Sequence, residues 1–166
     1  MLTLAELNQM PSDAFEQALS PLLEHCSWVL PELESHRPFV DKDAIKRLIA
    51  SVLKLKTPVN LQMQAIKNHP KLSVGLPQEG FSQSEQKSAG LDQLTAEEFA
   101  EFKADNDRYE AVHQMPFIIA VSGLEKQTIF AEIKRRIDES SETEFATALN
   151  ALVSIACIRV DKLIAD

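Results

Sequence analysis

The C-terminal stretch SETEFATALNALVSIACIRVDKLIAD (residues 141–166) carries the clearest indication of the fold class. Six of its positions are separated by four, three, four, three and four residues: Phe145, Leu149, Leu152, Ala156, Arg159 and Leu163. This spacing places side chains on one face of an α-helix, which turns about once every 3.6 residues. Ser141 and Glu144 have the spacing of a capping box, which satisfies backbone groups in the first helical turn. We therefore predict a long terminal helix that begins at Ser141.

The rest of the chain shows the same periodicity. Capping boxes are predicted at Thr3–Glu6 and at Thr95–Glu98, and each opens a helix. Three further helices are predicted in the first part of the chain: one from Ser12, one over residues 28–35 and one after Asp41. The next has Thr57 as its cap and Pro58 at the first helical position, and it ends before Pro70. Two more are predicted over residues 82–89, with Gly90 as C-cap, and after Gly123. The sequence thus predicts an all-α fold of about eight helices.

Two segments do not fit a helix. Residues 70–81 hold two prolines and two glycines, which indicates an irregular loop. Residues 115–121 (MPFIIAV) have the composition of a strand, but one strand cannot make a sheet. We interpret this run as a buried extended segment whose backbone groups need partners, and a bound ligand is one possibility. The predicted organisation is a single compact helical domain covering residues 1–166.

Composition limits the classes of function. The net charge of −8 argues against nucleic acid and against an anionic membrane surface, because both attract clustered Lys and Arg. No run of 18 or more apolar residues is present, so no membrane span is expected. The N-terminus has no signal-peptide pattern and the C-terminus no peroxisomal address, so we expect a cytoplasmic protein.

Motifs for common cofactors and metals are missing from the sequence. The four glycines are scattered, which excludes the glycine-rich phosphate loops of P-loop and Rossmann enzymes. Cys26 and Cys157 form no CxxC pair, and the histidines show no HxxxH or HExxH spacing. We predict two reduced thiols and no metal site.

Three features interrupt the structural pattern. Arg159 lies within the apolar stripe of the terminal helix, so it faces either a carboxylate or an anion-binding cavity, or its head group reaches water. His69 ends a helix just before Pro70, which suits a proton-transfer group but also a simple exposed or capping residue. Ser82-x-x-Glu85 reads as a capping box, or as a polar cradle for a heterocycle at a helix N-terminus.

Five blocks, in this order, resemble the OHCU decarboxylase family. They are NHPKL, SQSEQKSAGLDQL, the Asn106-x-x-Tyr109 pair, MPFIIAVSGL and IACIRVDKL, and they extend over about residues 57–163. The resemblance implies an all-helical homodimer without cofactor. The expected reaction is decarboxylation of 2-oxo-4-hydroxy-4-carboxy-5-ureidoimidazoline (OHCU), a small-molecule substrate of urate breakdown, to (S)-allantoin and CO2.

The resemblance also implies roles for individual residues. His69 and Glu85 are the expected catalytic residues, with His69 as the proton-transfer group. The expected substrate-binding residues are Pro70, Ser82, Ser84, Glu85, Gln86, the segment Phe117, Ile118, Ile119, Ala120 and Val121 with its main-chain groups, and Arg159.

One run departs from the family pattern. Members commonly have a glycine and an aromatic residue or histidine just before the PFI segment, whereas residues 112–115 here read Val-His-Gln-Met. Without that glycine, a differently shaped turn is expected at the start of the segment. The departure favours one alternative, a relative that acts on another ureido or purine-derived compound. A second alternative is a non-enzymatic helical binding module in which the motifs serve only as caps and core contacts.

Overall fold

The structure is a computed structural model that describes residues 1–72 and 80–165. Within this part the chain forms α-helices and no strand, which confirms the all-α prediction. Nine α-helices are described, in agreement with the expected number of about eight: α1 (Leu4–Gln9), α2 (Ser12–Leu19), α3 (Val29–Ser35), α4 (Lys42–Ser51), α5 (Val59–Asn68), α6 (Gly80–Ser88), α7 (Ala96–His113), α8 (Lys126–Ile137) and α9 (Ser141–Leu163). A 3₁₀ turn, η1 (Ser20–Leu22), follows α2, and a π-helical turn, η2 (Val52–Lys56), follows α4.

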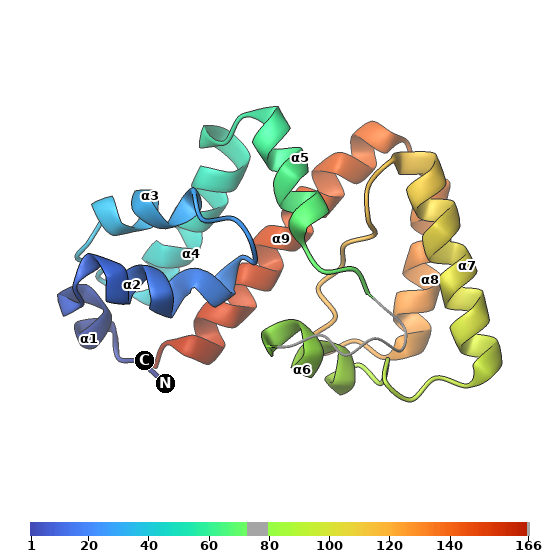
Figure 1. Ribbon diagram of the computed structural model, residues 1–166, viewed down its shortest axis with the longest axis horizontal. Helices are drawn as coiled ribbons and strands as arrows, with labels where there is room; N and C mark the ends of the chain where they lie inside the picture. Colours follow the sequence, from blue (N-terminus) through green and yellow to red (C-terminus); the bar gives the residue numbers. More distant parts are fainter. Residues whose placement is uncertain (73–79, 166) are drawn as a thin grey trace. The chain divides into compact units, whose positions relative to one another are not determined.

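The chain divides into two compact units. The first comprises residues 1–69 and 152–166, and the second comprises residues 70–151. Helix α9 therefore contributes its first part to the second unit and its last part to the first. Figure 1 identifies the helices of each unit along the chain. The single-domain prediction stays a prediction.

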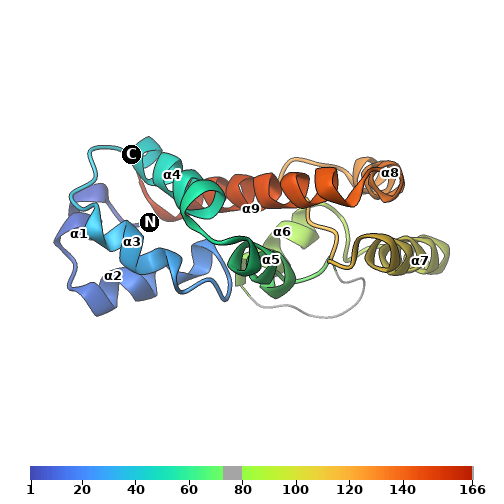
Figure 2. The same ribbon diagram turned by 90° about the horizontal axis from the view of Figure 1, so that it is seen from above.

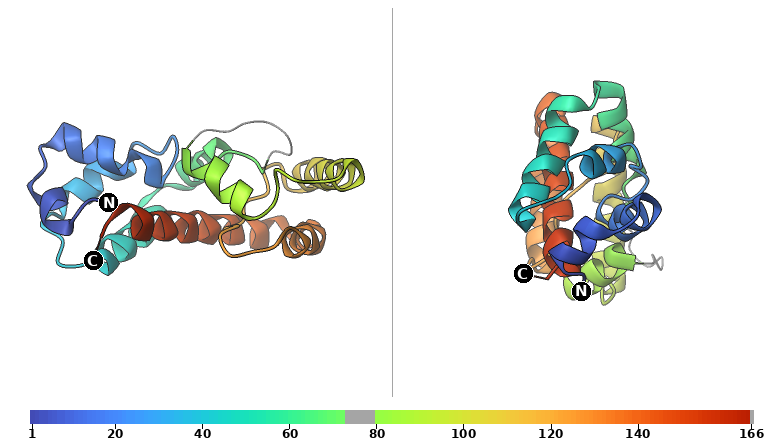
Figure 3. Two further views of the ribbon diagram at one scale, coloured as in Figure 1. Left: turned by 90° about the horizontal axis from the view of Figure 1, so that it is seen from below. Right: turned by 90° about the vertical axis from the view of Figure 1, so that its left-hand side faces the viewer.

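In the first unit, α1 to α5 and the last part of α9 bury their apolar faces. Thr3 and Glu6 form the predicted capping box, and the Asp41 side chain accepts the N–H of Ala44 at the start of α4. The two chain ends lie together, as Figure 3 shows, because Leu2 pairs with Ile164 in an isolated bridge. The principal buried side chains are Leu7, Phe15, Leu19, Leu33, Ile45, Ile49, Leu53, Ile66, Ala156 and Val160.

In the second unit, α7 and α8 lie side by side, as Figures 1 and 2 both show. Thr95 and Glu98 form the predicted capping box of α7, and the rings of Phe102 and Phe130 lie 5.0 Å apart between α7 and α8. Residues 115–121 run without helical or strand structure. Residues 115–118 and 121 are buried, which agrees with the predicted buried crossing segment.

Three predicted helix N-caps were wrong. Helix α5 begins at Val59 with Pro58 as its N-cap, and the Thr57 hydroxyl instead donates to the carbonyl of Val52. Ser82 lies inside α6 rather than before it, so it is not the cap of that helix. For α9, the hydroxyl of Ser140 accepts the N–H of Thr143, one residue earlier than predicted.

The chain makes a left-handed turn at the end of α7, in a conformation that glycine favours. Gln114 adopts the left-handed conformation with φ 58° and ψ 29°, and its N–H donates to the carbonyl of Glu110. A left-handed residue with a side chain costs on the order of 1 kcal/mol relative to glycine. Because Gln114 rather than glycine takes this position, the turn carries that cost. The predicted loop 70–81 is wrong at its C-terminal end, since α6 includes residues 80 and 81. Residues 73–79 lie outside the described part.

One helix in the described part, α9, is long and apolar enough to cross a membrane by length and composition. This criterion is also met by core helices, and α9 carries Glu144 and Arg159, whose side chains are almost completely buried. Both groups form ion pairs inside the fold, so we interpret α9 as a core helix.

Candidate active site

His69 stands at the C-terminal end of α5, in the first unit. It is the C-cap of the helix, with extended backbone angles, and Pro70 follows it. A residue before proline avoids the helical region, so the sequence itself ends α5 here and turns His69 out of the helix. The side chain is only 11% exposed, and its Nδ1 lies 3.4 Å from Oε2 of Glu24. The alternative of an exposed histidine is therefore wrong.

Arg159 reaches the same carboxylate from α9. Its side chain is 0% exposed, so the alternative in which its head group reaches water is also wrong. Its Nη1 lies 3.3 Å from Oε2 of Glu24 and donates to the carbonyl of Pro21 at 3.1 Å. Of the two buried environments considered from sequence, the structure provides the carboxylate. His69 and Arg159, from distant parts of the chain, thus meet at one oxygen of Glu24.

The turn between η1 and α3 places Glu24 for these contacts. His25 adopts a left-handed conformation with φ 58°, which reverses the chain immediately after Glu24. The side-chain amide of Asn68 donates to the carbonyl of His25 and so ties the turn to the end of α5. Burial raises the pKa of the next side chain, the Cys26 thiol, to about 12, and the nearby Glu24 carboxylate adds to that shift. A turn held at both sides gives Glu24 a defined position between the histidine and the arginine.

The predicted polar cradle lies on α6, in the second unit. Ser82 and Glu85 are both buried and lie three residues apart on one helical face. Gln86 is partly buried. Ser84 lies on the exposed side of α6, where its hydroxyl donates to the carbonyl of Phe81. Burial of Ser82 and Glu85 fits the cradle interpretation better than the capping interpretation.

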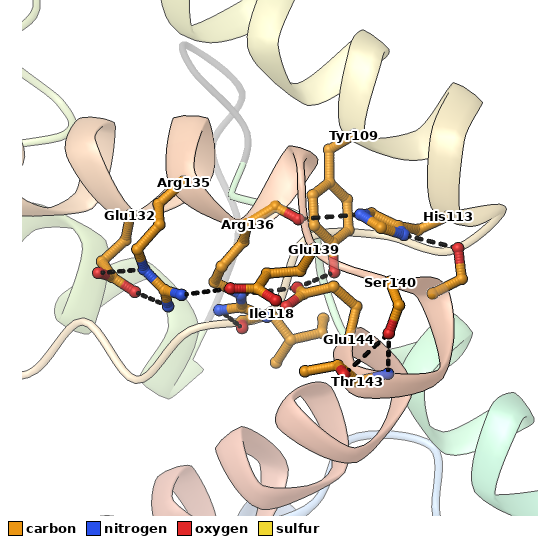
Figure 4. Close-up of polar contacts among 11 residues, drawn as sticks. Tyr109, His113, Ile118, Glu132, Arg135, Arg136, Glu139, Ser140, Thr143 and Glu144 are labelled. Atoms are coloured by element: carbon orange, nitrogen blue, oxygen red, sulfur yellow. Dashed lines mark hydrogen bonds and ion pairs between the residues drawn. The ribbon is translucent and has the colours of Figure 1, made fainter.

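The segment Phe117–Val121 is held by Arg136 of α8, also in the second unit. Nη1 of Arg136 donates to the carbonyl of Ile118 at 2.8 Å (Figure 4). The guanidinium carbon of Arg136 lies 4.6 Å from the centre of the Phe117 ring. One of the backbone groups that needed a partner therefore has a side-chain donor. Residues 119 and 120 are only partly buried.

A buried network surrounds Arg136 (Figure 4). Its Nε donates to Oε1 of Glu144 at 2.7 Å, and the hydroxyl of Tyr109 donates to the same oxygen at 2.6 Å. His113 contacts the carbonyl of Arg136 through Nε2 and the hydroxyl of Ser141 through Nδ1. Burial, and next the hydrogen bond to Glu144, raises the pKa of the Tyr109 phenol well above its usual range. Glu144 is therefore a core ion-pair partner and not the helix cap predicted from sequence.

Sequence reasoning missed Glu24 and Arg136. Arg136 stands beside the helical stripe of Ile129, Ile133 and Ile137, so its position on an apolar face was a usable signal, as it was for Arg159. Glu24 gave no such signal, because it lies in a turn without periodicity. Among the described residues, no three His, Cys, Asp or Glu side chains converge on a possible metal position.

The sequence matches the family model described as OHCU decarboxylase over residues 8–161. The chain belongs to the OHCU decarboxylase family. It is 34% identical over 163 residues to the 2-oxo-4-hydroxy-4-carboxy-5-ureidoimidazoline decarboxylase of Haloferax volcanii, with 96% of this chain and 94% of the relative covered. It is 33% identical to the uric acid degradation bifunctional protein of Bacillus sp. (strain TB-90), but it spans only 32% of that longer protein.

Two solved structures share the fold of this family member. The crystal structure of (S)-allantoin synthase matches with a TM-score of 0.82 and 22% identity, covering 99% of this chain and 54% of that chain. The crystal structure of OHCU decarboxylase in the presence of (S)-allantoin matches with a TM-score of 0.74 and 19% identity, covering 90% of this chain and 99% of that chain. At these identities the likeness supports the all-α fold and no more.

Proposed function

We propose that this protein decarboxylates OHCU to (S)-allantoin and CO2, as a carboxy-lyase of urate degradation. Membership in the family and the names of its relatives support the reaction class. The structural observation that carries the proposal is the meeting of His69 and Arg159 at the carboxylate of Glu24. A buried imidazole and a buried guanidinium, held together, supply a proton-transfer group and a fixed cation in a water-poor place.

The substrate itself supplies the electron sink. Loss of CO2 breaks the bond between the carboxylated carbon and the carboxyl carbon, and the electron pair left behind moves into the adjacent C=N bond. One proton must then reach one face of the new centre to set the S configuration. His69 is the proposed donor of that proton, since imidazole exchanges protons near neutral pH. Because the ring provides the sink, the proposal includes no metal and no cofactor.

Arg159 is proposed to anchor polar groups of the substrate. A bare cation facing the carboxylate would stabilise the ground state as much as the transition state and so add nothing to kcat. Its pairing with Glu24 moderates the charge that the substrate meets. In the second unit, Glu85 with Ser82, Ser84 and Gln86 is proposed to hold the ureido group and the ring.

The main chain from Phe117 to Val121, with Pro70, completes the proposed binding residues. The hydrogen bond from Arg136 to the carbonyl of Ile118 and the ring contact on Phe117 support a fixed conformation for this segment. A fixed backbone is what a substrate-holding segment requires, because misplaced donors and acceptors reduce transition-state binding.

A homodimer and a cytoplasmic location complete the proposal. The homodimer is carried by the resemblance to the family, whereas the cytoplasmic location and the single domain over residues 1–166 rest on the sequence patterns described above. Sedimentation equilibrium of the purified protein tests the dimer, with a mass near twice 18.5 kDa expected and a mass near 18.5 kDa as the contrary result.

The test of the reaction uses substrate made in the cuvette from urate by uricase and the hydrolase that follows it. We expect this protein to accelerate loss of the substrate's ultraviolet absorbance, and His69→Ala to abolish that acceleration while far-ultraviolet circular dichroism stays unchanged. His36→Ala is the matched control, since His36 lies at the exposed end of α3 and should keep full activity. Full activity in His69→Ala would overturn the role of His69.

The binding-module alternative predicts exposed motif residues. Arg159, Glu85 and His69 are instead buried or nearly so, which favours the enzyme. The alternative of another ureido substrate rested on residues 112–115. There His113 contacts the Ser141 hydroxyl and the Arg136 carbonyl through its two ring nitrogens, and Gln114 adopts the left-handed conformation.

A further inference from the structure

His69 and Arg159 both contact Glu24, and none of the sequence motifs includes Glu24. We propose that Glu24 is the positioning residue of the active site: its carboxylate fixes the orientation and tautomer of His69 and holds the guanidinium of Arg159. This inference deepens the proposed function and rests on it for its catalytic consequence.

The geometry gives Glu24 this role through one oxygen. Oε2 lies 3.4 Å from Nδ1 of His69 and 3.3 Å from Nη1 of Arg159. A carboxylate facing Nδ1 favours the tautomer that carries its proton there, which leaves Nε2 to exchange a proton with substrate. The side chain of Glu24 is itself only 21% exposed, so water screens these contacts weakly.

Two hydrogen bonds hold the backbone before and after Glu24. Asn68, the residue before His69, binds the carbonyl of His25, the residue after Glu24. Arg159 binds the carbonyl of Pro21 on the other side of the same turn. The end of α5 and helix α9 therefore supply both the side chains that contact the Glu24 carboxylate and the hydrogen bonds that hold the backbone near it. His25 stays in a left-handed conformation within this turn, and such conformations cluster at functional sites.

The chain offers a matched control for Glu24. Glu32 also faces a histidine and a cation within the first unit: its Oε1 lies 4.0 Å from Nδ1 of His36 and pairs with Lys56. These three residues are more exposed to solvent, and none of them belongs to the proposed site. Glu32→Gln thus removes the same charge from a carboxylate with the same kinds of partner, but at the surface.

The experiment compares Glu24→Gln, Glu24→Asp and Glu32→Gln with the unmodified protein. Proteins labelled with ¹⁵N-histidine are studied by NMR, and His69→Ala assigns the His69 resonances. We expect Glu24→Gln to shift the Nδ1 and Nε2 resonances of His69 and to lower kcat about 10- to 100-fold, as loss of an orienting partner does elsewhere. Glu24→Asp keeps the charge and should restore part of kcat, while Glu32→Gln should change neither readout.

Each outcome decides the proposal. Unchanged His69 resonances in Glu24→Gln overturn it, whether or not kcat or the melting temperature falls, because Glu24 would then contribute only to stability. Shifted resonances with full kcat overturn the catalytic consequence. If the unmodified protein does not accelerate OHCU decay, the proposed function fails, yet the resonances still decide whether Glu24 positions His69.

Discussion

Replacing Arg136 by Met tests the buried network of the second unit. The variant removes the ion-pair partner of Glu144, which is 1% exposed, and leaves the hydroxyl of Tyr109 as a donor to that carboxylate. It also leaves the carbonyl of Ile118 without its side-chain donor. Breaking one side of a buried ion pair costs about 3–5 kcal/mol, because the remaining charge stays desolvated. We therefore expect the free energy of unfolding to fall by about 3–5 kcal/mol.

For a chain of this length, such a loss lowers the melting temperature by about 6–20 °C. The assay is urea unfolding followed by far-ultraviolet circular dichroism, with the slope of the transition checked for constancy. Arg135→Gln is the control, since the neighbouring Arg135 pairs with Glu132 and Glu139 at the surface, where it is 55% exposed. Surface pairs contribute about 0–1 kcal/mol.

Removing both charges of the Arg136–Glu144 pair shows how much of the lost stability is due to leaving one charge unpaired. The double variant Arg136→Met/Glu144→Met should lose less stability than the sum of the two single variants, by about 2 kcal/mol or more, since no unpaired charge remains. If Arg136→Met costs no more than Arg135→Gln, the network does not stabilise the second unit and the reasoning fails.

Three further predictions follow from individual residues. Tyr109 is the only tyrosine, and its pKa is raised, so absorbance at 295 nm should not change near pH 10 in the folded protein. The neutral phenol stabilises the fold fully below about pH 10, and this contribution is lost as the pH rises toward the pKa of the folded state. A reversible rise of the absorbance at 295 nm near pH 10 without unfolding would contradict this prediction. Burial raises the pKa of Cys26 to about 12, so a thiol reagent at pH 8 should label the less buried Cys157 first and Cys26 only on unfolding. Thr95→Ala removes the N-cap of α7 and should lower the free energy of unfolding by about 1 kcal/mol, whereas Thr95→Ser should nearly preserve it in the same urea assay.

The helices were largely predictable because apolar periodicity reports burial directly. The predicted stripe of α9 is confirmed by the burial of Leu149, Leu152, Ala156 and Arg159, and the capping boxes at Thr3 and Thr95 are confirmed too. The errors arose where one residue type fits two environments. Glu144 has the spacing of a capping partner, but Arg136 binds its carboxylate in the core. Ser82 likewise resembles a cap, although α6 already includes Gly80.

The site was predictable only in part. Arg159 was detectable because a guanidinium within an apolar stripe requires a buried partner, and that partner proved to be Glu24. The identity of the partner depends on how a turn, the end of α5 and the last part of α9 pack together. No local sequence pattern predicts the contact between Glu24 and Arg159. His69 was identified through its resemblance to a family motif and through the proline that ends its helix.

Optical activity of the product tests the central claim most directly. Spontaneous decay of OHCU gives racemic allantoin, so circular dichroism at the allantoin band separates catalysis from background. We predict that (S)-allantoin forms at a rate proportional to the concentration of this protein. Slow formation of optically inactive allantoin, at a rate independent of that concentration, would contradict the account.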